Sequence, residues 1–175
     1  MIEGALRNIQ NPRFRGTLRN ILRENHSVIS EDNLDLGRSD TMQHKIHLKN
    51  NEPVYTKQFH LPSNHLDLVS KWVKDWVKIG IVQPTRSAYN SPIFCVPKPK
   101  GDGLRVVLDY RKLNSATIPD RYSIRGVDEC IQLVGEAGSK MFTTLDLTTG
   151  FWQMKLEEQA RHLTAFTLPE SCCQI

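Results

Sequence analysis

One amphipathic segment, residues 65–79, constrains the fold of this chain more than any other part of the sequence. Its apolar side chains recur at i, i+3, i+4, i+7 and i+8, which places them in one stripe along a helix. They are Val69, Trp72, Val73, Trp76 and Val77. Asn64 can cap the start of this helix, and Gly80 can end it. Because such a stripe is usually buried, we interpret both tryptophans as packing residues that anchor the helix to a core.

A predicted β-hairpin follows this helix. Residues 93–96 and 104–109 have the composition of strands, and a proline and two glycines lie in the short connection between them. Alternation along the second strand puts Arg105 on the face opposite its main apolar stripe.

Two further segments show a regular pattern. Residues 44–61 are predicted to be extended, with a turn at Asn50 and Asn51. A second amphipathic helix is predicted over residues 124–134. Its side chains that we expect in the core are Val127, Cys130, Ile131 and Val134.

Residues 1–43 differ in composition from the rest of the chain. They carry a basic stretch followed by an acidic one, with only a short helical possibility at 18–22, so we interpret them as a leader or linker that a partner orders. The 175 residues, 39% of them hydrophobic, can bury the core of one domain. No apolar run approaches the roughly 20 residues that span a bilayer, and no signal-peptide core is present. We expect no membrane partner and a location inside the cell, in the cytoplasm, the nucleus or both.

The excess positive charge of the chain, +4, lies between Lys98 and Arg125. That window contains seven basic residues against three acidic ones. Basic residues on a hairpin and its following loop can contact phosphates, which is the sequence-independent part of nucleic-acid binding. They can equally form a solvated surface that keeps the chain soluble, and charge alone does not choose between the two interpretations.

Asp146 lies at the end of the apolar segment 141–147, where the chain turns. Alternation predicts a strand here, with Asp146 on the same face as Phe142 and Thr144. A carboxylate on a half-apolar face needs a partner, and a divalent cation is one such partner. The spacing also fits an aspartate that caps the following turn at 148–150.

Three stretches, taken in order, resemble one known family: GIVQPTRSAYNSPIFCVPKPKGDGLRVVLDYRKLN, FTTLDLTTGFWQMKL and LTAFTLP. They resemble the fingers and first palm segment of reverse transcriptases, closest to those of gypsy-class long-terminal-repeat retrotransposons and their Pol polyproteins. The resemblance implies a partial right-hand polymerase fold of the α+β class. It implies fingers and the start of the palm at 44–139 and a first catalytic palm segment at 140–175, with 1–43 as a polar leader.

The resemblance also implies roles for individual residues. Asp146 matches the first of three aspartates that bind two magnesium ions about 4 Å apart in such enzymes. Arg105 matches an arginine of the fingers that packs on the base and contacts the triphosphate of the incoming deoxynucleotide. Either Lys98 or Lys100 matches a lysine that reaches the γ-phosphate, and the local sequence PKPKGDG does not decide which.

Two more matches concern the sugar and the template. Phe151 matches an aromatic residue that lies beneath the sugar and excludes a 2′-hydroxyl, although it also fits an ordinary core aromatic. Gln153 matches a residue near the template and the nucleotide. The implied partners are an RNA or DNA template-primer and deoxynucleoside triphosphates, together with the remainder of a polyprotein or a second subunit.

The sequence departs from the family in two places. The second and third aspartates of the family lie in a YxDD motif, which this sequence does not contain, and Leu163 stands where the family usually has lysine. A lone carboxylate holds magnesium weakly. Two hypotheses follow: a fragment of an RNA-directed DNA polymerase that is inactive alone, or a non-catalytic nucleic-acid-binding or interaction module derived from a retrotransposon.

Overall fold

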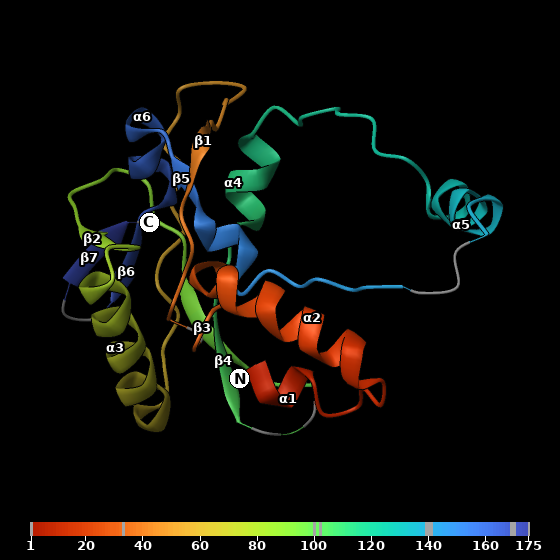
Figure 1. Ribbon diagram of the computed structural model, residues 1–175. Helices are drawn as coiled ribbons and strands as arrows, with labels where there is room; N and C mark the ends of the chain where they lie inside the picture. The colour runs from red at the N-terminus through yellow and green to blue at the C-terminus, as the bar shows by residue number, and fades with distance from the viewer. Residues whose placement is uncertain are drawn as a thin grey trace. The chain divides into compact units, whose positions relative to one another are not determined.

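The computed structural model describes residues 2–32, 34–99, 101, 103–138, 142–168 and 171–174. The chain divides into two compact units. Unit 1 comprises residues 1–42 and 147–155, and unit 2 comprises residues 43–146 and 156–175. Helices and antiparallel strands are both present, as an α+β fold requires (Figure 1).

Unit 1 is mainly helical. It contains α1 (Ile2–Ala5), α2 (Pro12–Glu24), the 3-10 turns η1 (His26–Val28) and η2 (Gly150–Gln153), and most of the strand pair β1 (Ser39–His44) and β5 (Met154–Leu156). The helix predicted at residues 18–22 was too short, because α2 extends over Pro12–Glu24. The side chain of Asn11 accepts hydrogen bonds from the backbone N–H groups of Arg13 and Phe14, and Pro12 occupies the first turn. These two start signals explain the longer helix.

Helix α3 (Ser63–Lys78) in unit 2 confirms the predicted amphipathic helix. Val69, Val73 and Trp76 of the stripe are buried, and Gly80 ends the helix with a φ of 76°. The predicted cap at Asn64 was wrong. The carbonyl oxygen of Pro62 already accepts the first backbone hydrogen bonds, so the helix begins one residue before Asn64.

The predicted hairpin is confirmed as β3 (Ile93–Pro97) and β4 (Leu104–Leu108), which pair antiparallel. Ile93 and Val106 are buried on one face of the hairpin. Gly101 and Gly103 adopt φ values of 70° and 92° in the connection, a left-handed region that other residues rarely enter.

A three-stranded antiparallel sheet forms a second part of unit 2. Its strand order is β2 (Gln83–Pro84), β7 (Ser171–Gln174) and β6 (Phe166–Leu168). Phe166 is fully buried and forms a parallel bridge with Ser91, which links this sheet to the segment that precedes β3.

Three short helical elements surround an apolar cluster in unit 2. The elements are α4 (Arg111–Ala116), α6 (Glu158–Arg161) and the 3-10 turn η3 (His162–Thr164). They contribute Leu113, Ala160 and Leu163, which pack with Tyr89. The buried hydroxyl of Tyr110 donates to the carbonyl oxygen of Thr164, and burial raises the pKa of this tyrosine. The position that departs from the family, Leu163, is therefore a packing position in this chain.

Asn90 joins three segments of unit 2. Its backbone N–H donates to the Val54 carbonyl, and its backbone carbonyl accepts from Thr56 N–H at 2.8 Å. Its side-chain Nδ2 donates to the Thr56 carbonyl, and its Oδ1 accepts from Thr167 Oγ1 at 2.7 Å. Within residues 44–61, which were predicted to be extended, Leu48 and Tyr55 form isolated β-bridges, and the chain bends at residues 49–51, where a turn was predicted.

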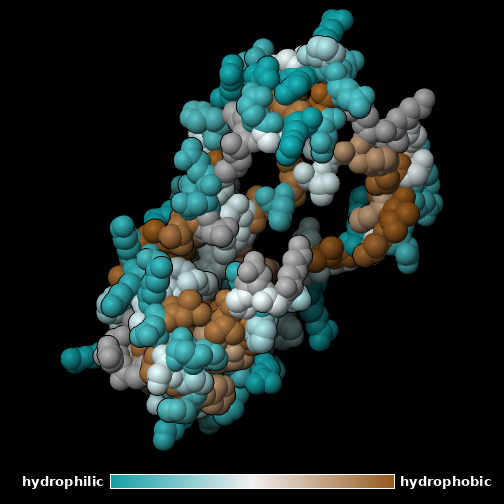
Figure 2. Space-filling view, turned by 90° about the horizontal axis from the view of Figure 1, so that it is seen from below, coloured by the Kyte–Doolittle hydropathy of each residue, from teal (hydrophilic) through white to brown (hydrophobic). Residues whose placement is uncertain are grey.

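Two expectations from the sequence were wrong. Helix α5 forms at Val127–Glu136, but every residue from 118 to 138 is exposed, including Val127, Cys130, Ile131 and Val134. Residues 142–147, which were expected to form a strand, are extended without strand pairing in the described part of the chain, and Leu145 is 90% exposed. Figure 1 shows extended chain leading into α5 and extended chain over residues 142–147, and Figure 2 shows apolar side chains exposed on the surface. Local pattern produced the helix, but no described element covers its apolar face.

A salt bridge at the start of α4 predicts a pH dependence of stability. The carboxylate of Asp109 accepts hydrogen bonds from Nε and Nη2 of Arg111 at 2.8 and 2.7 Å, and also from the Arg111 backbone N–H. These bonds lower the pKa of Asp109 from 3.8 to about 2. Because the pKa is lower in the folded state, the ionised carboxylate stabilises the fold above about pH 4 and loses this effect as the pH falls toward 2.

We therefore expect Asp109→Asn to lower the free energy of unfolding by about 1 kcal/mol at pH 6, since solvent screens the exposed guanidinium. The difference from the parent chain should vanish near pH 2. Urea unfolding at both pH values measures it, with Asp120→Asn as the control because Asp120 is exposed. An equal loss at both pH values would contradict the assignment of the effect to this ion pair.

Candidate functional site

Asp146 is exposed and lies on the extended segment 142–147, where it is the last residue that belongs to unit 2. The residue directly before it, Leu145, is almost fully exposed, so no apolar face surrounds the carboxylate. No cluster of three or more His, Cys, Asp or Glu side chains that could hold a metal ion occurs among the residues that the structure describes. Asp146 can supply one carboxylate to a metal site and no more than that.

The turn after Asp146 belongs to unit 1 and has an unusual backbone. Thr149 adopts a left-handed φ of 50°, and η2 begins at Gly150. Phe151 on this turn is 99% exposed, so it is not a core aromatic within its unit. The side chain of Gln153 is held in place, because its Nε2 donates to the carbonyl oxygen of Thr148 at 3.0 Å.

Two cations lie on one face of the β3–β4 hairpin. Arg105 pairs directly with Val96, so their side chains share a face. Lys98 follows Val96 by two residues, and its N–H donates to the Gly103 carbonyl, which continues the ladder. Lys98 and Arg105 are therefore diagonal neighbours on this face, and both are exposed. Lys100, the other candidate lysine, lies outside the described residues.

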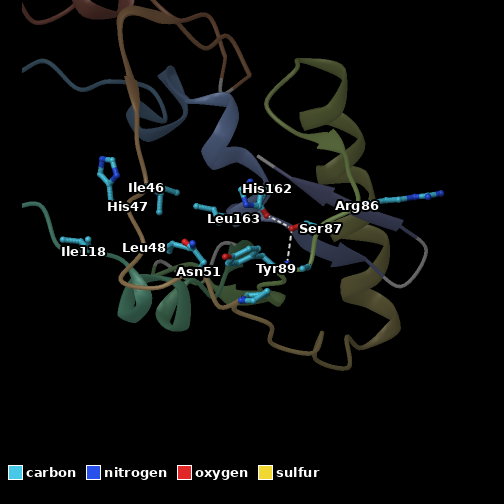
Figure 3. Close-up of a pocket in the computed structure, with 12 residues that line it drawn as sticks. Ile46, His47, Leu48, Asn51, Arg86, Ser87, Tyr89, Ile118, His162 and Leu163 are labelled. Carbon is cyan, nitrogen blue, oxygen red and sulfur yellow. Dashed lines mark hydrogen bonds between the residues drawn. The ribbon is translucent and has the colours of Figure 1, made fainter.

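Unit 2 also contains an open groove that the sequence did not predict (Figure 3). It has a volume of about 840 Å³, with Ile46, Leu48, Tyr89 and Leu163 among its apolar lining residues. Ser87 shapes one wall, because its hydroxyl donates to the His162 carbonyl and accepts from the Tyr89 N–H. The segments that line the groove are far apart in the sequence, so no local pattern identifies it. Of the six residues predicted for the functional site, none that the structure describes lines this groove.

No helix in the described part of the chain is long and apolar enough to cross a membrane.

Comparison with known proteins identifies the family. The family described as "Reverse transcriptase (RNA-dependent DNA polymerase)" matches residues 96–175. The Retrovirus-related Pol polyprotein from transposon 297 of Drosophila melanogaster is 36% identical over 154 residues, which are 86% of this chain and 14% of the polyprotein. The chain belongs to the reverse transcriptases of gypsy-class retrotransposons. The Pol polyprotein from transposon gypsy of the same fly is 42% identical over 123 residues, which are 67% of this chain and 12% of that polyprotein. This reverse-transcriptase chain thus spans about one seventh or less of the curated relatives that it matches.

Solved structures confirm the partial polymerase fold. The crystal structure of the prototype foamy virus protease-reverse transcriptase CSH mutant matches with a TM-score of 0.81 and 25% identity, covering 99% of this chain and 23% of that one. A foamy viral protease-reverse transcriptase in complex with an RNA/DNA hybrid matches with a TM-score of 0.80 and 22% identity, which shows the fold alone. The resemblance read from the sequence was therefore correct in family and in fold.

The structure brings together only some of the predicted site residues. It places Lys98 and Arg105 on one hairpin face, and it puts Asp146 in the same unit. Phe151 and Gln153 belong to unit 1. The roles of these residues in binding and catalysis stay predictions.

Proposed function

We propose that this chain forms the fingers and first palm segment of an RNA-directed DNA polymerase, which extends a primer with deoxynucleotides on an RNA or DNA template inside the cell, in the cytoplasm or the nucleus. The observation that carries the proposal is the exposed cationic face of the β3–β4 hairpin, in a chain of the reverse-transcriptase family. Paired cations suit a triphosphate, because the planar guanidinium of arginine binds phosphate with two donors and lysine adds a compact charge.

Each site residue has a distinct task in this proposal. Arg105 packs on the base of the incoming deoxynucleotide and holds its triphosphate, and Lys98 reaches the terminal phosphate. Phe151 excludes a 2′-hydroxyl with its exposed ring. Gln153, oriented by the Thr148 carbonyl, lies near the template and the nucleotide. The sequence left Lys98 and Lys100 as alternatives for this role, and Lys98 is proposed here because it shares the exposed face of the hairpin with Arg105.

The described residues supply only part of a metal site of the kind that the family uses. Reverse transcriptases depend on a divalent metal, and we propose magnesium, with Asp146 as one of its ligands. The described residues do not fit a whole magnesium site, because such sites combine several oxygen ligands and Asp146 has no carboxylate cluster around it. The other ligands would come from the remainder of a polyprotein or a second subunit, so activity belongs to that assembly.

A chimera tests this proposal. Residues 44–175 replace the matching segment of the transposon gypsy Pol polyprotein, and the chimera and the 175-residue chain are assayed for primer extension with magnesium. We expect extension by the chimera and none by the chain alone. A folded chimera that binds template-primer without extending it, beside an active gypsy parent, would contradict the polymerase proposal and support a non-catalytic binding module. Extension by the 175-residue chain alone would contradict the incomplete metal site.

A further inference from the structure

Helix α2 of unit 1 presents a row of arginines that the proposed polymerase site does not use. Arg15, Arg19 and Arg23 are spaced four residues apart, so they lie along one side of the helix. At 1.5 Å per residue they are separated by about 6 Å each. The side chains of Arg15 and Arg19 are 41% and 31% exposed, and Arg23 is also exposed.

A carboxylate of the same unit occupies part of this row. The two oxygens of Glu3 in α1 accept hydrogen bonds from Nε and Nη2 of Arg19 at 2.9 and 3.0 Å. Arg19 thereby holds the pKa of Glu3 below its usual value. Arg15 Nη2 lies 3.8 Å from the same carboxylate, which is too far for a hydrogen bond, and Arg15 Nε is a buried atom without a hydrogen-bond partner in the described part of the chain. The guanidinium of Arg19 is thus hydrogen-bonded to an anion, whereas Arg15, whose side chain is 41% exposed, has the same carboxylate only at 3.8 Å.

The geometry of the row favours a repeating anion. A guanidinium binds phosphate with the same two-donor geometry that Arg19 uses for Glu3. Arg23 has no ion-pair partner among the described residues, so two of the three arginines lack a hydrogen-bonded carboxylate. We propose that Arg15, Arg19 and Arg23 bind phosphates along a single-stranded nucleic acid, and that Glu3 masks the row as an internal substitute for one phosphate.

The neighbouring apolar side chains favour nucleic acid over a lipid surface. Phe14 directly precedes Arg15 and is 44% exposed, so its ring is available for a base to stack on. Insertion into a membrane would need the whole apolar stripe of α2 to be free. Leu18 and Leu22 in the centre of that stripe are half-buried within the protein.

The binding of a labelled 12-nucleotide single strand to the 175-residue chain tests the proposal, with affinity measured by fluorescence anisotropy over a range of salt concentrations. We expect Glu3→Gln to tighten binding about fivefold at low salt and to steepen the salt dependence by about 0.7 for each additional phosphate that the row neutralises. Glu31→Gln is the control, because it removes the same charge from an exposed position of the same unit that is outside this row. Equal increases in affinity for both variants would overturn the masking role of Glu3.

A second comparison keeps the helix intact. In the Glu3→Gln background, Arg19→Ala should reverse the increase in affinity, whereas Arg13→Ala, on another side of α2, should leave most of it, with circular dichroism confirming the helix in both. Equal losses of affinity in these two variants would show that the row of arginines is not the binding site. If the chain binds anionic vesicles in preference to the oligonucleotide, or inorganic phosphate as tightly as the oligonucleotide, the proposal that the ligand is a nucleic acid is wrong. Because the assay contains no deoxynucleotide or metal, its outcome is independent of the polymerase proposal.

Discussion

Asp146→Asn in the gypsy chimera is expected to reduce primer extension by about three orders of magnitude. Asparagine keeps the size of the side chain and removes its charge. Neutralising the charge that develops during phosphoryl transfer is worth several kcal/mol, and each 1.4 kcal/mol is about tenfold in rate. Because Asp146 is exposed in this chain, its replacement should not disturb the fold. Steady-state extension rates on an RNA template, measured beside thermal unfolding, separate a loss of catalysis from a loss of stability.

The control for this prediction is Asp128→Asn. Asp128 is an exposed aspartate in α5. Asp128→Asn therefore makes the same chemical change at a position outside the proposed catalytic centre. We expect extension within about twofold of the parent chimera, as for most surface substitutions. An Asp146→Asn chimera that keeps the parent rate would assign Asp146 to the turn-capping role that its spacing also fits, and would leave the chain without a catalytic carboxylate.

The sequence predicted those elements whose signals are local. The stripe of α3 and the glycines of the β3–β4 hairpin depend on a few adjacent residues, and both elements form as expected. The start of α3 was missed because Pro62, and not Asn64, accepts the first backbone hydrogen bonds. Helix α2 was underestimated because its start signals, Asn11 and Pro12, lie outside the apolar pattern of the leader.

The candidate site was predictable in part. Alternation placed Arg105 on the outer face of its strand, but the relation of Lys98 to Arg105 needed the register Val96–Arg105 across the hairpin. The exposure of Phe151 and of the residues around Asp146 was not predictable. Alternation says which side chains share a face, whereas burial depends on whether another element covers that face. The family resemblance supplied the roles of these residues, and no spacing rule could have done so.

Asn90→Ala is expected to destabilise unit 2 by about 3 kcal/mol, the largest stability effect we predict. Asn90 is 2% exposed, and its amide is bonded to the Thr56 carbonyl and the Thr167 hydroxyl. Alanine would leave both groups without this partner in the interior, at a cost of about 1–3 kcal/mol for each unpaired group, and would add a small cavity. For a domain of this size the melting temperature should fall by about 6–12 °C.

The effect of Asn90→Ala is specific to its place between three segments, and a matched asparagine tests this. Asn114 is exposed on α4, so Asn114→Ala should change stability by less than about 0.5 kcal/mol. Urea unfolding of both variants gives the comparison. Equal changes would mean that the Asn90 amide adds nothing to the backbone hydrogen bonds and the packing that hold the Val54–Thr56 segment and β6 in place. A large loss confined to Asn90 would instead show that one buried amide connects segments 111 residues apart in the chain, from Thr56 to Thr167. Neither partner of this amide could have been identified from the sequence around Asn90.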